Sequence, residues 1–290
     1  MLTRLGLAFV WLAHFLPLAL LGPVGRALGN LLFLLGRERR EVALTNLRLC
    51  FPQWSETEHR RLARRHFQAF GRSFVEHGIL WWSPKQRVQQ LVRIEGLEHW
   101  QAVAGRPVIW LAPHFIGLDM GGVRLTADYP LVSVYSHQKN PEFDAVLYHG
   151  RTRFVPPELY SRQEGIRPVV KAIRNGLPFY YLPDMDFGSR DSIFVPFFGV
   201  QAATITGLSR IARLADAVVV PAVTRQLAGA GGYVLTFYPA WRDFPSEDIE
   251  RDTRRMNAFI EERVLEMPEQ YFWLHKRFKT RPAGEPGCYE

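Results

Sequence analysis

The chain has 290 residues, of which 36 are Lys or Arg and 28 are Asp or Glu, so its formal net charge is +8. Its composition, 47% apolar and 13% aromatic, excludes a disordered protein because such a chain can bury enough apolar surface to fold. Two cysteines, Cys50 and Cys288, are too few for a disulfide framework or a cysteine-rich zinc site, which indicates a reducing compartment. The excess of arginine favours an anionic partner: nucleic acid, an anionic membrane surface or a phosphorylated substrate.

The first 36 residues are predicted to bind a membrane. Residues 5–25 carry no Asp, Glu, Lys or Arg and only one titratable side chain, His14. At about 1.5 Å per residue a helix of this length would match the roughly 30 Å of a bilayer core. The apolar run 27–36 is too short to cross and indicates an interfacial segment. This pattern favours an uncleaved anchor over a cleaved signal peptide or a soluble core helix, and a membrane over nucleic acid as the anionic surface.

The charges beside this stretch predict its orientation. Only Arg4 precedes it, whereas arginines follow it at positions 26, 37, 39 and 40. The positive-inside rule then places the rest of the chain on the cytoplasmic face of the inner membrane.

Residues 37–290 are predicted to form one catalytic domain. A capping box of Ser55 and Glu58 opens a helix predicted to run to about Ile79, with arginines on its polar side at positions 60, 61, 64 and 65. We interpret these arginines as a solvated face, with contact to anionic lipid or an acidic partner as the alternative.

From residue 93 onward, short apolar runs alternate with helical patterns. Strands are predicted at 108–111, 131–135, 178–182, 217–223 and 233–238, and helices near 117–127, 141–150, 165–175, 202–215 and 246–266. This alternation predicts an α/β fold with a mixed, largely parallel sheet flanked by helices, behind an N-terminal membrane-anchoring helix.

The strand predicted at 108–111 runs into the most informative turn of the chain, which contains His114 and Asp119. Ligands of open α/β sheets bind at the carboxyl ends of strands. Residues five apart on a regular helix lie about 140° apart, so His114 and Asp119 can face each other only if His114 precedes the helix, which Pro113 and Gly117 permit. A histidine held by a carboxylate can act as a general base toward a hydroxyl. The alternative is a locally bonded histidine, with Asp119 capping a turn.

A second strand end carries acidic residues. Asp184 and Asp186 follow the strand predicted at 178–182. They could ligate a metal, but no dense cluster of histidines or carboxylates accompanies them, and we expect none. Between the two acidic segments lie Arg151 and Arg153, which would be within reach of an anion if the strands are neighbours.

Together these motifs resemble the lipid A late acyltransferases, the lauroyl or myristoyl transferase branch of the lysophospholipid acyltransferase superfamily. The resemblance rests on the His-x-x-x-x-Asp turn, the Gly-Arg-x-Arg pair, the Pro-Asp-x-Asp-x-Gly strand end, the Phe-Val-Pro-Phe-Phe-Gly block and the closing segment 268–282. It covers the whole chain. Two departures are Asp119, where members often carry Glu, and Tyr-Ser-His at 135–137 in place of Tyr-Arg-Pro.

The resemblance implies a membrane-anchored O-acyltransferase with an acyltransferase-like fold. It would move a fatty acyl chain from acyl carrier protein to a hydroxyl of a lipid A precursor of the Kdo-lipid IVA type. His114 would be the base, Asp119 its orienting acid, and Arg151 and Asp184 further residues of the site. No cofactor is expected, because the thioester donor is already activated.

Binding of the anionic substrates is assigned to a second set of residues: Arg153, Asp186, Lys276, Arg277 and Lys279. The last three belong to a basic cluster near the chain end, for which a solvated basic tail is the alternative.

Two other functions stay open at this point. One keeps the chemistry and changes the acceptor to a glycerophospholipid or an ornithine-type lipid. The other is a non-catalytic, membrane-bound module that binds anionic lipid and would not need His114.

Overall fold

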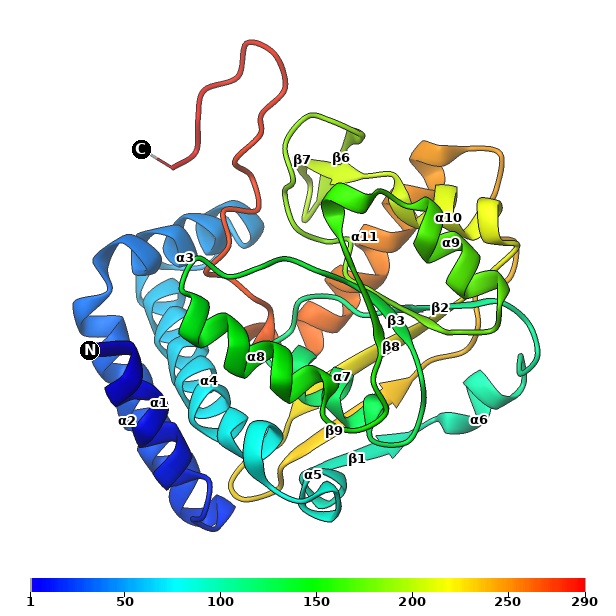
Figure 1. Cartoon of the computed structure of the whole chain (residues 1–290). Helices are drawn as coiled ribbons and strands as arrows, with labels where there is room; N and C mark the ends of the chain where they lie inside the picture. Colours follow the sequence, from blue (N-terminus) through cyan, green and yellow to red (C-terminus); the bar gives the residue numbers. More distant parts are fainter. Residues whose placement is uncertain (1, 290) are drawn as a thin grey trace.

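A computed structural model describes residues 2–289, with side chains from Thr3 onward. Met1 and Glu290, the outer ends of the two predicted regions 1–36 and 37–290, lie outside the described residues. At the centre is a seven-stranded sheet covered by helices (Figure 1). Its strands are β1 (Val92–Glu95), β2 (Val108–Leu111), β3 (Val132–Tyr135), β4 (Glu158–Ser161), β5 (Phe179–Tyr181), β8 (Val218–Gln226) and β9 (Tyr233–Phe237).

The strand order is β1-β9-β8-β2-β5-β3-β4. Strands β8, β2, β5, β3 and β4 are mutually parallel, whereas β9 runs antiparallel to β8 and pairs in parallel with β1. The predicted mixed, largely parallel sheet is therefore confirmed. Since β2 and β5 are direct neighbours, the chain segments that leave their carboxyl ends emerge side by side.

Both faces of the central strands are buried, as expected for parallel strands covered by helices. In β2, Ile109 and Leu111 enter one apolar core, while Val108 and Trp110 enter the other. The helices over the sheet and around it are α5 (Lys85–Leu91), α6 (Leu97–Gln101), α7 (Leu118–Thr126), α8 (Pro141–Thr152), α9 (Arg167–Arg174), α10 (Gly207–Ala215) and α11 (Ile249–Glu266), with short 3₁₀ turns at Arg162–Glu164 and Pro268–Gln270.

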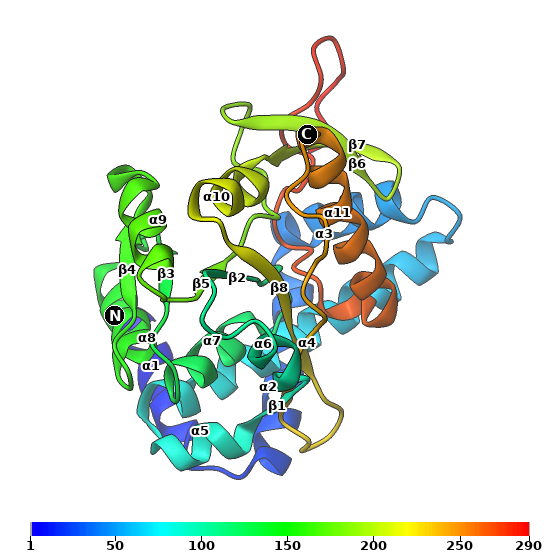
Figure 2. The ribbon, with the colours of Figure 1, turned by 90° about the vertical axis from the view of Figure 1, so that its right-hand side faces the viewer.

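A two-stranded antiparallel hairpin, β6 (Ser192–Phe197) and β7 (Val200–Ile205), stands apart from the main sheet. It lies at the end of the molecule opposite α5 in both views (Figure 2). Its two-residue turn has positive φ at both Phe198 and Gly199, as the right-handed twist of a tight hairpin requires. The helix predicted at 202–215 is therefore wrong in its first third, because that segment pairs as β7 and α10 starts at Gly207.

The N-terminal region is a helical hairpin rather than one helix over 5–25. Helix α1 (Leu2–Ala13) ends before Pro17, and α2 (Leu18–Leu35) is the apolar helix long enough to cross a bilayer. A proline removes a backbone donor and fixes φ, so the chain turns there. Helices α3 (Arg37–Cys50) and α4 (Glu56–Trp82) follow, and α4 begins at the predicted Ser55–Glu58 capping box.

Helix α2 packs directly on α4 through glycines. A Cβ atom on Gly25 would lie 2.3 Å from Arg72 Cα, and one on Gly29 would lie 2.1 Å from the Phe67 carbonyl oxygen. Only a residue without a side chain permits this approach. In the ribbon, α2 runs alongside α4 (Figure 1), so the hairpin is part of the folded body of the protein.

Candidate active site

The candidate site forms where β2 and β5 end. The Ala112 amide donates to the Tyr181 carbonyl oxygen at 2.8 Å, which continues the β2–β5 pairing by one residue. His114 and Asp184 follow this last contact on their respective strands. Residues 70 positions apart in the chain are thereby brought into contact.

Asp184 is the carboxylate that holds His114. Its Oδ1 lies 2.7 Å from His114 Nδ1, and the His114 backbone amide donates to the same carboxylate at 3.0 and 3.1 Å. Burial alone would raise the pKa of Asp184, which is 1% exposed, but the charge and hydrogen bonds of His114 lower it overall. An ionised carboxylate on Nδ1 fixes the tautomer and leaves Nε2 free to accept a proton.

Asp119 has other partners, so the structure corrects its predicted role as the orienting acid. Helix α7 starts at Leu118, and His114 does precede it as required. The Asp119 side chain, however, accepts hydrogen bonds from Arg151 Nε at 3.1 Å and Arg151 Nη2 at 2.6 Å, and its Oδ2 lies 3.4 Å from Nε2 of His77. The physical reason is that β2 and β5 end together, which puts Asp184 closer to the His114 ring.

Arg151 and His77 flank Asp119. Burial would raise the pKa of the Asp119 carboxyl, yet Arg151 and His77 hold it well below its usual range. Arg151 also lies over the Tyr135 ring, 5.5 Å from its centroid. A carboxylate held in this way serves to orient a guanidinium.

Glycines allow α7 to lie close to β8 beside the site. A Cβ atom on Gly121 would lie 2.1 Å from Thr224 Oγ1, and one on Gly117 would lie 2.8 Å from the Thr224 carbonyl oxygen and Cγ2. These glycines therefore set the position of Asp119 in the first turn of α7.

The structure places Arg153 away from Arg151. Its guanidinium donates to the carbonyl oxygens of Leu80 at 2.9 Å and Ser83 at 2.5 Å, at the end of α4. These contacts join the end of α8 to α4 and occupy the guanidinium. Its proposed contact with substrate would require breaking them.

Asp186 is likewise engaged within the protein. It accepts hydrogen bonds from the Thr280 amide at 2.6 Å, the Thr280 hydroxyl at 2.8 Å and the Gly188 amide at 2.9 Å. Its own amide donates to His275 Nε2 at 2.9 Å, and burial is the first cause that lowers the pKa of His275 to about 4. Within residues 2–289, no group of three or more metal-ligating side chains converges here or elsewhere.

The closing segment 268–282 is not a free basic tail. Phe115 pairs with Tyr271 in an isolated antiparallel bridge, and the Phe272 amide donates to the His114 carbonyl oxygen at 2.9 Å. The segment thus holds the loop that carries His114. Sequence reasoning identified the segment but not this pairing.

The predicted basic cluster divides between interior and surface. Arg277 is 2% exposed and donates to the Ala203 carbonyl oxygen at 2.9 Å and to Thr204 Oγ1 at 2.8 Å. Lys279 is exposed, and Lys276 lies over the Tyr289 ring. Arg277 therefore supports β7 in this structure, which corrects its prediction as part of a surface grip on an anion.

Sequence reasoning missed His77 altogether. It lies 42 residues before Asp119, on a different element. Nothing in its position on α4 sets it apart from the other polar residues of that helix. A histidine near the buried side of a helix was the only available signal.

A small, largely apolar cavity of about 70 Å³ is lined in part by Asp119 and Arg151. Tyr135 and Tyr180 contribute to its wall. The pKa of the Tyr135 hydroxyl is raised, and burial is the largest cause. The apolar part of the lining comes from α7 and from the parallel strands and their loops: Leu118, Val123, Leu131, Val134, Pro157, Leu159 and Leu182.

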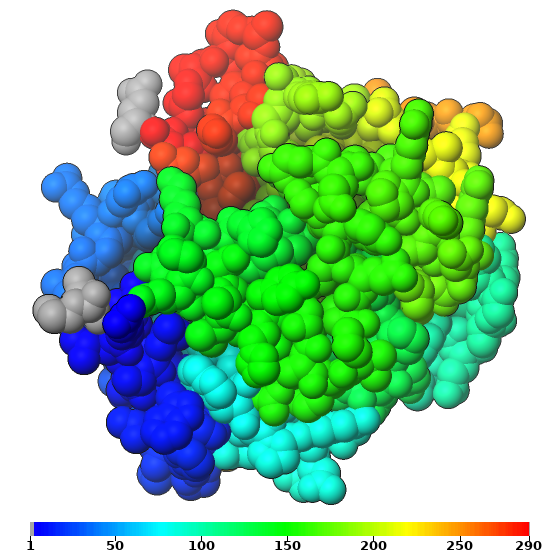
Figure 3. Space-filling view, in the orientation of Figure 1, coloured from blue at the N-terminus to red at the C-terminus, as the bar shows by residue number. Residues whose placement is uncertain are grey.

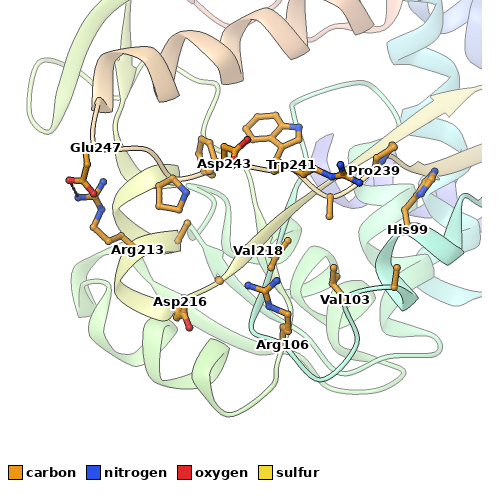
Figure 4. Close-up of a pocket in the computed structure, with 17 residues that line it drawn as sticks. His99, Val103, Arg106, Arg213, Asp216, Val218, Pro239, Trp241, Asp243 and Glu247 are labelled. Atoms are coloured by element: carbon orange, nitrogen blue, oxygen red, sulfur yellow. Dashed lines mark hydrogen bonds and ion pairs between the residues drawn. The ribbon is translucent and has the colours of Figure 1, made fainter.

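A larger hollow lies at the other end of the sheet, where β2 and β8 begin (Figure 4). Charged side chains of both signs surround it, among them Arg106, Arg213, Asp216 and Glu247, and Arg213 is paired with Glu247 at 3.1 Å. None of the predicted site residues lines this hollow.

The chain is similar in sequence to known bacterial acyltransferases. The family model of the bacterial lipid A biosynthesis acyltransferases matches residues 1–280. The lipid A biosynthesis lauroyltransferase of Escherichia coli K12 is 35% identical, over 99% of this chain and 94% of that protein. A lipid A biosynthesis acyltransferase of Haemophilus influenzae is 36% identical, over 97% and 88%.

Two further proteins are similar. The lipid A biosynthesis palmitoleoyltransferase of Escherichia coli K12 is 32% identical, over 99% of this chain and 94% of that protein. The match to a crystal structure of a 1-acyl-sn-glycerophosphate acyltransferase from Thermotoga maritima covers 79% of this chain and 97% of the acyltransferase chain, with a TM-score of 0.38 and 14% identity. On the family match and the three sequence relatives, the chain belongs to the bacterial lipid A biosynthesis acyltransferases.

Proposed function

We propose that this enzyme transfers a fatty acyl chain from acyl carrier protein to a hydroxyl of a lipid A precursor of the Kdo-lipid IVA type, with His114 as the general base. The observation that carries the proposal is the 2.7 Å contact of His114 Nδ1 with Asp184 at the carboxyl edge of the sheet. Because Asp184 engages Nδ1 and not Nε2, the Nε2 atom of His114 is suited to deprotonate a hydroxyl. Membership of the family supports lipid A as the acceptor class.

In the proposed reaction, His114 Nε2 takes the hydroxyl proton while the hydroxyl oxygen attacks the thioester carbonyl carbon. Asp184 stabilises the imidazolium that forms. When the tetrahedral intermediate collapses, the carbon–sulfur bond breaks, and the leaving thiolate takes the proton from His114. An ester and a free thiol result, and no metal or covalent enzyme intermediate is required because the thioester is already activated.

Arg151 is the proposed donor for the oxyanion of the intermediate. Preorganised donors are most effective where charge develops in the transition state. Asp119 engages Nε and Nη2 of Arg151, and Nη1 makes no hydrogen bond within the described residues. The Arg151 side chain is 30% exposed, which leaves that group accessible to substrate.

The part of the acyl chain next to the thioester is proposed to enter the apolar cavity that Asp119 and Arg151 line. Each methylene buried there contributes about 0.8 kcal/mol, which a polar lining would not supply. Leu118 and Leu182, from α7 and from the segment after β5, line the cavity near the two catalytic segments. Substitutions at such positions should change the preferred chain length.

The N-terminal hairpin is proposed to attach the enzyme to the cytoplasmic face of the inner membrane by lying in the lipid interface. Its apolar side chains are exposed over one outer edge of the molecule, coloured blue in Figure 3: Leu5, Phe9, Trp11, Leu12, Phe15, Leu16, Leu20, Val24, Leu31, Leu34 and Leu35. Helix α2 packs along α4, which carries Arg64, Arg65 and Arg72. A crossing by α2 would draw these arginines into the bilayer core at high cost, so an interfacial position is favoured.

The activity is tested with purified protein, an acyl carrier protein thioester and separate acceptors, with products identified by mass spectrometry. We expect one added acyl group on the lipid A precursor and none with a glycerophospholipid or an ornithine-type lipid. Folded His114→Ala protein serves as the control. Transfer only to another lipid would contradict the acceptor, and full transfer by His114→Ala would contradict the mechanism.

The attachment is tested by fractionation. The triple substitution of Phe9, Leu12 and Phe15 by Ser should move the protein from the membrane to the soluble fraction, because it removes exposed apolar area from the hairpin. The matched control replaces the exposed Leu214 and Leu265, which lie far along the chain from the hairpin. Retention of the triple variant on membranes would contradict the interfacial model.

A further inference from the structure

His77 lies on the side of α4 that faces the candidate active site. Its Nδ1 is 2.6 Å from the Ser73 carbonyl oxygen, one turn earlier in the helix, and its ring packs 5.5 Å from the Trp81 ring. The side chain is 16% exposed. Both flanking contacts restrict the ring, so its Nε2 is held in a set direction.

That direction is toward Asp119. His77 Nε2 lies 3.4 Å from Oδ2, while Oδ1 accepts both hydrogen bonds from Arg151. The two oxygens of the carboxylate are thus divided between two partners. Loss of either partner would free the Asp119 side chain to turn about its χ angles.

Both groups that face the ring nitrogens of His77 are hydrogen-bond acceptors. The Ser73 carbonyl can only accept, so Nδ1 carries a proton. The ionised Asp119 carboxylate also only accepts, so its contact with Nε2 is attractive when that nitrogen is protonated as well. In this arrangement the Asp119 carboxylate lies between the Arg151 guanidinium and the His77 ring.

The next turn of α4 supports the helix that carries Arg151. A Cβ atom on Gly150 would lie 2.1 Å from Trp81 Cδ1, so the end of α8 rests directly on this ring. His77 and Trp81 are four residues apart and therefore share one face of α4. This face of α4 contacts Gly150, the residue before Arg151. It also contacts the Asp119 carboxylate, which binds the Arg151 side chain.

We propose that His77 is a positioning residue for the acyl transfer: through Asp119, it holds the Arg151 guanidinium in the direction that the transition state needs. The inference rests on the proposed function, in which Arg151 stabilises the oxyanion. It assigns to α4 a part in catalysis beyond its packing against α2.

The first test is kinetic. His77→Ala should lower kcat/KM about tenfold, mostly through kcat, which is the lower end of what loss of a charge-assisted hydrogen bond produces. His77→Gln keeps an N–H donor and should recover part of this loss. In an Arg151→Lys background, His77→Ala should cost less than about twofold, because lysine has no bidentate guanidinium to orient.

The matched control is His66 on the same helix. Its Nδ1 also bonds a backbone carbonyl, that of Glu269 at 2.9 Å, but its Nε2 is buried without a partner. His66→Ala should therefore lower stability without changing kcat by more than about twofold. Equal loss of kcat from His66→Ala and His77→Ala, or the same factor for His77→Ala with Arg151 and with Arg151→Lys, would overturn the proposal.

A second test needs no activity. His77→Ala should lower the midpoint of thermal unfolding by about 2–4 °C, but by less than about 1 °C in an Asp119→Asn background. His66→Ala should have the same effect in both backgrounds. If the parent enzyme fails to acylate the lipid A precursor, the proposed function fails, and additive midpoint shifts for His77 and Asp119 would separately overturn the inference.

Discussion

Asp184 and Asp119 lie in two neighbouring regions with different environments. Asp184 is 1% exposed and bonds the backbone and the ring of one residue, His114. The Asp119 side chain is 28% exposed and contacts side chains from two other helices, Arg151 and His77. The comparison teaches that a His-x-x-x-x-Asp spacing locates a site without stating which side chains pair within it.

The largest effect is expected from the His114–Asp184 pair. His114→Ala should lower kcat by about 10²–10⁴-fold, since it removes the general base. Asp184→Asn should lower kcat to a similar extent because the ring would lose the partner that selects its tautomer. Single-turnover transfer assays on folded protein measure both. If Asp184→Asn keeps more than a tenth of the activity, another group orients His114.

Asp119 should matter less than Asp184, and for a different reason. Asp119→Asn should lower kcat about 10- to 100-fold by loosening Arg151, whereas Asp119→Glu should stay within about tenfold of the parent because the charge remains. Steady-state kinetics of these variants, alone and combined with Arg151→Lys, measure the effect. The distinction between Asp119 and Asp184 would be wrong if Asp119→Asn lowered kcat as much as His114→Ala and the double variant lost no more activity than either single one. Asp119 would then be the partner of His114 during turnover.

The closing segment sharpens the comparison because it packs on the side of the His114–Asp184 pair. Arg277→Ala should lower the free energy of unfolding by about 2–4 kcal/mol, since two buried acceptors would lose their donor. Lys279→Glu should leave stability unchanged and raise KM about two- to fivefold at low salt, because an exposed ionic contact acts similarly on ground and transition states. Thermal unfolding and salt-dependent kinetics separate the two. If both variants changed stability and KM equally, Arg277 would instead act as part of the exposed basic cluster.

The smallest effect concerns pH. Burial lowers the pKa of His66 and, with neighbouring charges, that of His275 to about 4. Both are therefore neutral in the fold near neutral pH, and the unfolded chain binds more protons between pH 6.5 and about 4. Stability should fall as pH drops through this window. His66→Gln should lessen the fall in the unfolding midpoint by a few degrees. An unchanged pH profile would show that His66 is protonated in the fold.

Local patterns alone predicted most of the elements near the site. The strand predicted at 108–111 has the same bounds as β2, and the Ser55–Glu58 capping box opens α4. The predicted turn around Pro113 and Gly117 also forms, with α7 starting just after it. Such features depend on residues close in sequence, which is why one chain suffices to predict them. The β6–β7 hairpin was missed because its strand-forming residues run into a helical pattern.

The N-terminal region shows how far composition reaches. Its apolar character was readable, but the close contacts of Gly25 and Gly29 with α4 depend on the partner helix. An apolar stretch has the same composition whether it crosses a bilayer or lies on another helix. The packing of α2 against α4 appears only in the tertiary structure, and the interfacial position that we propose rests on it.

The sequence by itself determined which residues stand at the strand ends: His114 after β2 and Asp184 after β5, each following an apolar run. Only the tertiary structure decided that these two meet, because the adjacency of β2 and β5 is a property of the strand order and not of either segment. The contacts of Asp119 with Arg151 and His77, and the burial of Arg277, likewise depend on how distant segments pack together. Pairing between distant segments follows from which surfaces pack together, and that is settled by the fold as a whole.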